Sequence, residues 1–293
     1  MLTSIEHIVK TASEQRCRIS EVVLEHEVVT SGRPRDLVVE KMRKRLGIML
    51  LSIEKGKHLA ERSPTGLSGG DAARILSHSP VQDTLSEVLG RAIAVAEYNA
   101  AMGKIVAAPT AGSAGVLPAV LSVVAERFGA TEEQTAMSLF TAAGIGMVIS
   151  HRATLAGAQG GCQAECGSAS AMAAGAAVEL ANGNPEQVSW AVASALSAQL
   201  GLVCDPVGGL VEVPCIQRNG YAGAVALSAL YLSLAGVKSL IPADEVIDAM
   251  YAVGRALPES LRETAAGGLA ATPTGLAIAA RCAMCAQRDS DPQ

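Results

Sequence analysis

The chain of 293 residues is long enough for one or two domains, at roughly 100–200 residues per domain. Only 2% of its residues are aromatic, so small and aliphatic side chains must fill the interior, which favours closely packed helices. The formal net charge is −5, and the basic residues are scattered apart from a run at 41–45 that we interpret as a solvated helix face. This pattern excludes the electrostatic footprint of a nucleic-acid-binding protein.

Residues 1–7 contain no basic segment followed by an apolar one, so no signal peptide is predicted and we expect a cytoplasmic protein. Seven cysteines in a reducing compartment argue against a disulfide framework. Residues 187–204 and 219–237 lack Asp, Glu, Lys and Arg and approach the roughly 20 residues of a membrane span. Because Gly, Ser, Asn or Gln occur throughout both, we interpret them as helices buried on all sides in a soluble core rather than in a membrane.

Helical signals recur along the chain, and strand signals are nearly absent. Apolar residues spaced by three and four predict an amphipathic helix over 35–55. A Thr-x-x-Gln capping box opens a predicted helix over 131–149, and an Asn-Pro-Glu start opens another over 184–200. A further helix is predicted to begin at Pro242.

No repeat of 20–50 residues and no linker rich in Pro, Gly and Ser divides the chain. We therefore predict one all-α domain over residues 1–293, with buried central helices rich in Ala and Gly and with glycine-rich connecting loops. A poorly ordered C-terminal tail is predicted over about 276–293.

Two glycine-rich segments, 65–72 and 108–116, each end in residues suited to starting a helix. Backbone N–H groups at a helix N-terminus bind carboxylates or phosphates. Neither segment has the Lys-Ser/Thr ending of a Walker loop or a preceding strand, and each can also be a simple turn between helices. Because both contain hydroxyl groups, we propose a small anionic ligand.

Three cysteines, Cys162, Cys204 and Cys215, stand beside glycines, prolines and acids at turns or at the ends of elements. Thiolates on loops can converge on an iron–sulfur cluster. Free cysteines are also among the most buried residue types, and a Cys-x10-Cys pair separated by 41 residues from a third cysteine is not a self-sufficient motif. Spacing alone leaves both interpretations open.

A family resemblance bears on these alternatives. From about residue 15 to residue 275 the chain resembles the alpha chain of iron–sulfur-dependent L-serine dehydratase. The motifs that carry the resemblance are, in chain order, KIVAAPTAGSAG (104–115), GGCQAE (160–165), GLVCDP with VEVPC (201–215), and LRET with GGLAATPTG (261–275). The resemblance implies that Cys162, Cys204 and Cys215 hold a 4Fe-4S cluster. It also implies a carboxylate-binding site for the substrate, for which the candidate residues are Ser68, Gly69, Thr110, Gly112 and Ser113.

The activity implied is the elimination of water from L-serine, giving pyruvate and ammonia, a step of amino-acid catabolism. With three protein ligands one cluster iron stays open, and it can act as a Lewis acid on the substrate hydroxyl. No pyridoxal phosphate is required, although Lys104 invites that alternative. A related cysteine desulfidase and a non-catalytic, cluster-bearing scaffold or regulatory subunit remain alternatives. The resemblance further implies a separate beta chain, and hence an alpha–beta heteromer.

The other thiols are predicted not to be ligands: Cys17, placed in the first helix, Cys166, and the pair Cys282 and Cys285. That pair could bind zinc, but no second pair completes a tetrahedral site.

His151 is the candidate general base within the chain. It lies where the sequence departs from the family pattern, because Arg152 stands where the family usually has Asn, and we expect this Arg to add charge near the pocket. The departure leaves the choice between L-serine, L-cysteine and L-threonine open. No base is convincingly supplied by this chain, so we expect it from the beta chain.

Overall fold

The structure is a computed structural model that describes residues 2–59 and 62–288. The described residues form helices joined by loops, with no strand among them except an isolated bridge between Cys204 and Arg262. The α-helices are α1 (Ile5–Gln15), α2 (Ile19–Ser31), α3 (Arg35–Lys57), α4 (Asp71–His78), α5 (Thr84–Ala100), α6 (Val116–Phe128), α7 (Glu132–Arg152), α8 (Gly157–Gly160), α9 (Ser168–Leu180), α10 (Pro185–Ser197), α11 (Cys215–Leu234), α12 (Ala243–Ala256) and α13 (Pro273–Arg288). The predicted all-α domain is confirmed.

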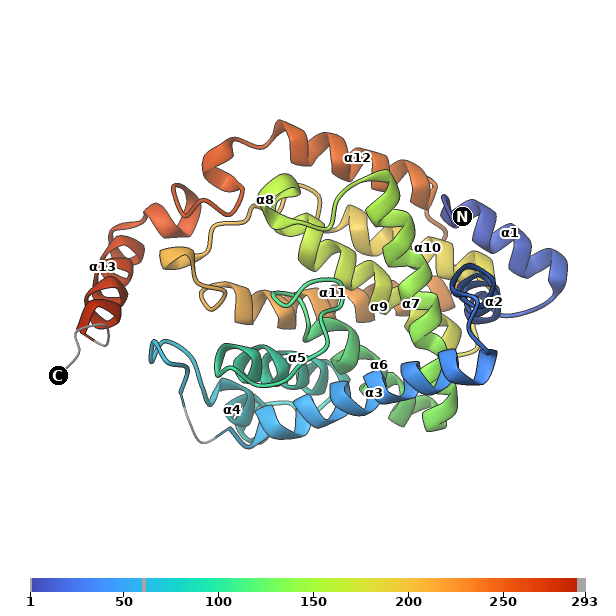
Figure 1. The fold of residues 1–293 in the computed structure, drawn as a ribbon, viewed down its shortest axis with the longest axis horizontal. Helices are drawn as coiled ribbons and strands as arrows, with labels where there is room; N and C mark the ends of the chain where they lie inside the picture. The colour runs from blue at the N-terminus through green and yellow to red at the C-terminus, as the bar shows by residue number, and fades with distance from the viewer. Residues whose placement is uncertain (1, 60–61, 289–293) are drawn as a thin grey trace.

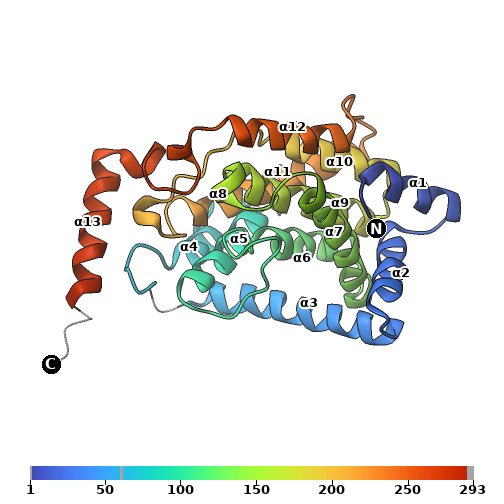
Figure 2. The ribbon, with the colours of Figure 1, turned by 45° about the horizontal axis from the view of Figure 1, so that its top comes forward.

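Helix α9 forms the centre of the fold, and every one of its residues is buried. It packs against α6, α7, α10 and α11, which surround it in Figures 1 and 2. Its Ala, Gly and Ser side chains allow this close approach: a Cβ at Gly175 would lie 2.4 Å from the Ile145 side chain of α7. The scarcity of aromatic residues therefore has a structural counterpart in short distances between helices.

The predicted helix starts are confirmed by their caps. In α7 the Thr131 side chain accepts a hydrogen bond from the Gln134 N–H, and the Gln134 side chain accepts one from the Thr131 N–H. Asn184 and Gln187 make the same reciprocal pair at the start of α10. Helices α3 and α12 also begin where the pattern places them.

Several details differ from the predictions. Helix α11 is not buried on all sides, because Tyr221 and Tyr231 are 62% and 50% exposed. Helix α10 ends at Ser197, before the expected residue 200, and Cys17 lies in the connection after α1 rather than in that helix. The tail expected to be poorly ordered is helical from residue 276 to Arg288, as part of α13, and residues 289–293 lie outside the described part.

The first helices and the last helix lie at opposite ends of the molecule. Helices α1 and α2 pack against the central helices, whereas α13 stands apart from the helical body in Figures 1 and 2. It is attached through the 3-10 turns Val207–Gly209 and Gly268–Ala271. Within the described ranges, no helix combines the length and the apolar character needed to cross a membrane.

Candidate active site

The three cysteines singled out in the sequence line one cavity of about 220 Å³. They come from separate parts of the chain: Cys162 follows α8, Cys204 lies in an extended loop, and Cys215 is the first residue of α11. Other residues that line this cysteine cavity are Thr110, Gly112, Glu165, Cys166 and Glu263. The cavity thus combines thiols with carboxyl and hydroxyl groups.

Gln163 holds the Cys162 turn against the Cys204 loop. Its side chain is almost fully buried, and its Nε2 donates hydrogen bonds to the carbonyls of Gly160 and Met250 at 2.9 and 3.0 Å. Its Oε1 accepts one from the Gly201 N–H at 2.9 Å, and its own N–H donates to the Leu202 carbonyl at 3.0 Å. A buried amide whose two N–H donors and oxygen all have partners fixes the segments that it joins.

Cys204 is held by the segment that follows α12. Its N–H donates to the Leu261 carbonyl at 2.9 Å, and its carbonyl accepts from the Glu263 N–H at 2.7 Å. This pairing brings Glu263 into the cavity, with a φ of +63° that residues other than glycine rarely adopt. The LRET motif therefore positions a cysteine and supplies a carboxylate.

Asn219 joins the Cys215 turn to the glycine-rich segment 108–116. It is fully buried, and its Nδ2 donates to the carbonyls of Cys215 and Gly112 at 2.9 and 2.8 Å. Its Oδ1 accepts from the Gly115 N–H at 3.0 Å. Sequence reasoning missed this residue, although an amide at the start of the long uncharged stretch 219–237 was a signal that could have identified it.

The residues proposed to bind the substrate divide into two groups. Thr110 and Gly112 line the cysteine cavity, and Ser113 is fully buried with its Oγ 3.1 Å from the Thr110 Oγ1. Ser113 therefore reaches the cavity through Thr110 rather than directly.

Ser68 and Gly69 are engaged elsewhere. The Ser68 Oγ donates to the carboxylate of Glu212, and the Gly69 N–H donates to the buried carboxylate of Glu97 at 3.2 Å. Glu97 also accepts from two N–H groups in the first turn of α4. The N-terminus of α4, one of the two predicted anion sites, thus already holds a carboxylate of the protein itself.

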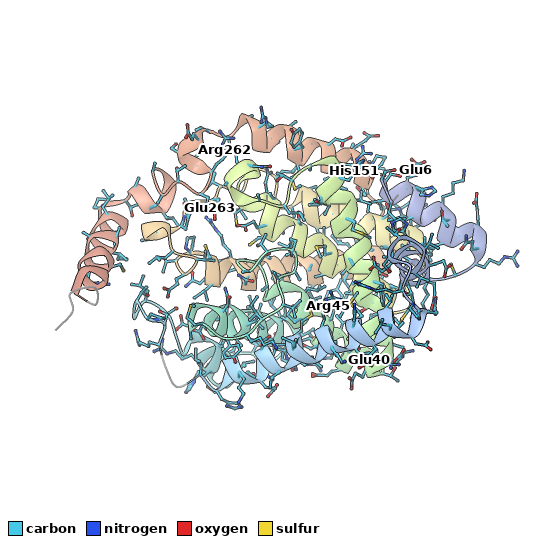
Figure 3. The ribbon with its side chains drawn as sticks, in the orientation of Figure 1. Glu6, Glu40, Arg45, His151, Arg262 and Glu263 are labelled. Atoms are coloured by element: carbon cyan, nitrogen blue, oxygen red, sulfur yellow. The ribbon has the colours of Figure 1, made fainter. Side chains whose placement is uncertain are left out.

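The structure does not bring His151 to the cysteines. His151 is exposed on the last turn of α7, and Figure 3 shows it well separated from Glu263. The expectation that Arg152 adds charge to the pocket is wrong: its guanidinium pairs with Asp248 of α12, with Nε 3.1 Å from one carboxylate oxygen, and lies 3.8 Å from Asp244.

The thiols have unequal environments. A hydrogen bond from Cys166 lowers the pKa of Cys162, and the nearby Arg218 guanidinium acts in the same direction. Burial raises the pKa of Cys215 to about 12 and that of Cys204 well above its usual value. Arg218 is anchored by a 2.9 Å hydrogen bond to the Val203 carbonyl and forms an ion pair with the buried Asp205 carboxylate at 2.8 Å, so the cation beside the thiols already has an acidic partner.

Glu165 is a candidate for proton transfer that sequence reasoning also missed. Burial raises the pKa of its carboxyl group, the charge of Glu263 adds to this, and a hydrogen bond from Thr110 opposes it. Only histidines were considered as bases from the sequence, because the position of a Glu inside the GGCQAE motif does not reveal its burial.

The thiols that line the cavity can be compared with what a metal cluster requires. Among the residues that the structure describes, no three His, Cys, Asp or Glu side chains are grouped tightly enough to hold one ion. Thiolates that hold a cluster bind different irons, so they need not meet at one point. Cys162, Cys204 and Cys215, which line one cavity together with Cys166, fit that requirement.

Fold and site together define an all-α protein with a thiol-lined, carboxylate-containing cavity. Residues 14–270 match the family described as Serine dehydratase alpha chain, and the chain belongs to that family. It is 45% identical over 280 residues to the probable L-serine dehydratase, alpha chain, of Bacillus subtilis (strain 168), covering 94% of this chain and 93% of the relative.

Two further relatives extend the comparison. The L-serine dehydratase, alpha chain, of Peptoniphilus asaccharolyticus is 41% identical over 283 residues, covering 95% of this chain and 97% of the relative. The L-serine dehydratase of Streptomyces coelicolor is 37% identical over 273 residues, covering 90% of this chain but 60% of the relative. The resemblance read from the sequence motifs is confirmed.

Proposed function

We propose that this chain is the cluster-bearing alpha chain of an L-serine dehydratase, which converts L-serine to pyruvate and ammonia. The observation that carries the proposal is the single cavity shared by Cys162, Cys204 and Cys215. Family membership supports it, because relatives that align over most of their length are named alpha chains of L-serine dehydratase.

In this proposal the three cysteines hold a 4Fe-4S cluster. When bound, the cluster supplies an iron with an open coordination position, a Lewis acid for the substrate hydroxyl. The pyridoxal phosphate alternative has no support from Lys104, which is exposed and does not line the cysteine cavity.

The residues of the chain itself then bind and orient serine. The Thr110 hydroxyl and the backbone around Gly112 face the cavity and suit the substrate carboxylate. Glu263 offers an acceptor for the substrate ammonium. Loss of the Cα proton and of the β-hydroxyl gives water and aminoacrylate, which hydrolyses to pyruvate and ammonia.

Glu165 is the side chain of this chain best placed to hold a proton within the cavity. A raised pKa brings a carboxyl group closer to neutral pH, where a general base is most effective. This proposal modifies the expectation of a base supplied wholly by the beta chain, which would instead close the site or add a second group.

A separate beta chain remains part of the proposal. The chain covers almost the whole length of relatives named alpha chain, but 60% of the Streptomyces coelicolor relative, whose name gives no chain designation. We propose that a beta chain corresponds to the remaining part. An alpha chain alone is then expected to bind iron and to turn over serine poorly.

The test is anaerobic purification of the chain, with measurement of iron, sulfide and absorption at about 400 nm, where thiolate-bound clusters absorb. Activity is then measured on L-serine and L-cysteine, with and without the beta chain. A cluster with serine turnover in the complex supports the proposal. Preferential release of sulfide from L-cysteine indicates a desulfidase, and a cluster without turnover of either substrate in the complex indicates a scaffold.

A further inference from the structure

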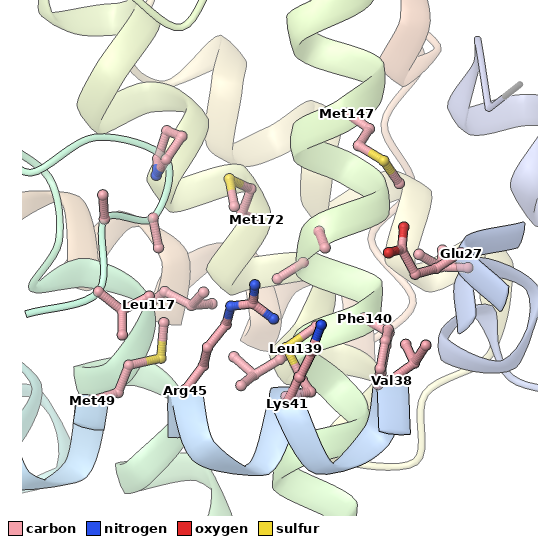
Figure 4. Close-up of a pocket in the computed structure, with 18 of the residues that line it drawn as sticks. Glu27, Val38, Lys41, Arg45, Met49, Leu117, Leu139, Phe140, Met147 and Met172 are labelled. Atoms are coloured by element: carbon pink, nitrogen blue, oxygen red, sulfur yellow. The ribbon is translucent and has the colours of Figure 1, made fainter. Parts of the chain in front are cut away.

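A second cavity lies between α3 and α7, on the other side of the segment that precedes α6. Its volume is about 320 Å³, and most of its wall is apolar. Figure 4 shows this α3–α7 cavity with Leu117, Leu139, Phe140 and Met172 around it. These four side chains are buried, so the cavity reaches into the core, whereas Arg33, Arg45 and Met147 of its wall are exposed and mark its opening to solvent.

Two basic side chains of α3 extend into this apolar space. Lys41 and Arg45 are four residues apart and therefore lie on the same face of the helix. Figure 4 shows both side chains reaching from α3 into the cavity. Neither has a carboxylate or a hydrogen-bond acceptor within bonding distance among the described residues.

The neighbouring basic residues of the same helix behave differently. Arg43 pairs with Glu133, and Lys44 lies 3.5 Å from Glu40, both outside the cavity. The remaining charged residues of the cavity wall are Arg33 and Glu27. The cavity wall thus carries three cations, Lys41, Arg45 and Arg33, and one carboxylate, that of Glu27. The excess positive charge at the edge of an apolar cavity complements an anion with an apolar body.

The volume limits the size of such a ligand. Small-molecule sites are typically about 300–1,000 Å³, mostly apolar with a few polar groups that fix orientation. The α3–α7 cavity, at about 320 Å³, lies at the lower end of this range and suits a ligand on the order of ten non-hydrogen atoms. Serine is too small and too polar to fill it.

We propose that the α3–α7 cavity binds an amphipathic monocarboxylate of about ten non-hydrogen atoms. Its chain lies among Leu117, Leu139 and Phe140, and its carboxylate binds Lys41 and Arg45. A cationic ligand of the same shape is repelled by both side chains. The alternative is that these long side chains merely cover apolar surface with their methylene groups, in which case no anion binds.

Octanoate, titrated calorimetrically into the purified full-length chain, is the probe. We expect saturable binding at one site with a Kd between about 0.1 and 10 mM, the range for so small a ligand. Lys41→Gln and Arg45→Gln are each expected to weaken binding by about three- to tenfold, since each removes one charged contact that is partly exposed to water. Lys44→Gln removes the same charge from the same helix outside the cavity, and should leave Kd unchanged.

Two further measurements separate the alternatives. Octylammonium should not bind, and Ala143→Phe, which places a ring in the cavity wall, should abolish octanoate binding while the melting temperature stays near that of the unmodified chain. The proposal is overturned by the absence of saturable binding, by equal weakening in Lys44→Gln, or by equal binding of octylammonium. It is also overturned if octanoate does not bind and Ala143→Phe instead prevents association with the beta chain, which would make the cavity a docking site.

Discussion

The two cavities on either side of the segment 106–112 are built in opposite ways. Around the cysteines, buried amides join separate backbone segments: the side chains of Gln163 and Asn219 each make three hydrogen bonds. In the α3–α7 cavity the walls are apolar, and the basic side chains of Lys41 and Arg45 have no acidic partner among the residues described. Hydrogen bonds fix the backbone segments around the cysteine cavity. In the α3–α7 cavity, the Lys41 and Arg45 side chains can change conformation to contact a ligand.

This difference matches what each site must do. Ligands of a metal cluster come from distant parts of the chain, so their backbones must be held in place before binding. A pocket for a flexible apolar anion needs volume and one charged end, which mobile Lys and Arg side chains supply.

The largest effect is expected from removing a cluster ligand. Cys162→Ala, Cys204→Ala and Cys215→Ala should each lose iron and serine dehydratase activity, because the other two thiols cannot retain the cluster. Iron content per chain and absorption at about 400 nm measure this after anaerobic purification. Cys17→Ala is the control, since Cys17 lies in the α1–α2 connection away from the cavity, and it should keep both. Full iron content in one of the three variants removes that cysteine from the ligand set.

The next largest effect is expected from Asn219, whose side-chain amide joins the Cys215 turn to the segment 108–116. Asn219→Ala leaves the Gly115 N–H and the Gly112 carbonyl without their partner. Each unsatisfied group costs about 1–3 kcal/mol, so unfolding by denaturant should show a loss of about 3 kcal/mol. Asn99→Ala, which removes one 3.3 Å bond to Ala111 of the same segment, is the matched control. A loss of less than about 1 kcal/mol in Asn219→Ala would show that the segment is held by other contacts.

Binding of the substrate should depend more on the Thr110 hydroxyl than on that of Ser113. Thr110→Val removes a hydroxyl that lines the cavity, so KM for serine should rise about tenfold, the effect of one lost hydrogen bond to a charged group. Ser113→Ala should raise KM less, because Ser113 acts through its 3.1 Å contact with Thr110. Steady-state kinetics of the loaded alpha–beta complex measure both. A larger rise in KM for Ser113→Ala than for Thr110→Val would reverse the assignment.

The sequence predicted the helices well because their signals are local. Capping pairs such as Thr131 with Gln134 depend on residues three apart, and both hydrogen bonds are present. The meeting of the three cysteines followed from a resemblance, since Cys162 and Cys204 have 41 residues between them and carry no local sign of contact. Asn219 and Glu165 were missed because their roles arise from burial and from partners on other helices.

Two further positions have partners that the sequence does not reveal. The glycine-rich segment at 65–72 has the sequence of an anion site, and its helix N-terminus does bind a carboxylate, that of Glu97. Sequence alone could not show that this carboxylate belongs to α5 rather than to a substrate. The expectation that Arg152 adds charge to the pocket was wrong for the same reason. Its partners Asp244 and Asp248 lie almost a hundred residues further along the chain.

The smallest predicted effect tests whether the two cavities act independently. Val106 to Pro109 line the α3–α7 cavity, and Thr110 to Gly112 line the cysteine cavity, so one segment forms part of both walls. A ligand that orders one end of this segment reduces the entropy that serine must remove at the other. Saturating octanoate should therefore lower KM for serine, but by no more than about fivefold, because Asn219 already fixes the segment at Gly112 and Gly115.

Calorimetry on the loaded complex checks the effect, with a non-reactive serine analogue titrated in place of serine. Linkage requires that octanoate changes the affinity for the analogue by the same factor as the analogue changes the affinity for octanoate. Equal affinities with and without octanoate would show that hydrogen bonding at Asn219 isolates the cysteine cavity completely, and a shift well above fivefold would show that the segment is less rigid than its bonds suggest.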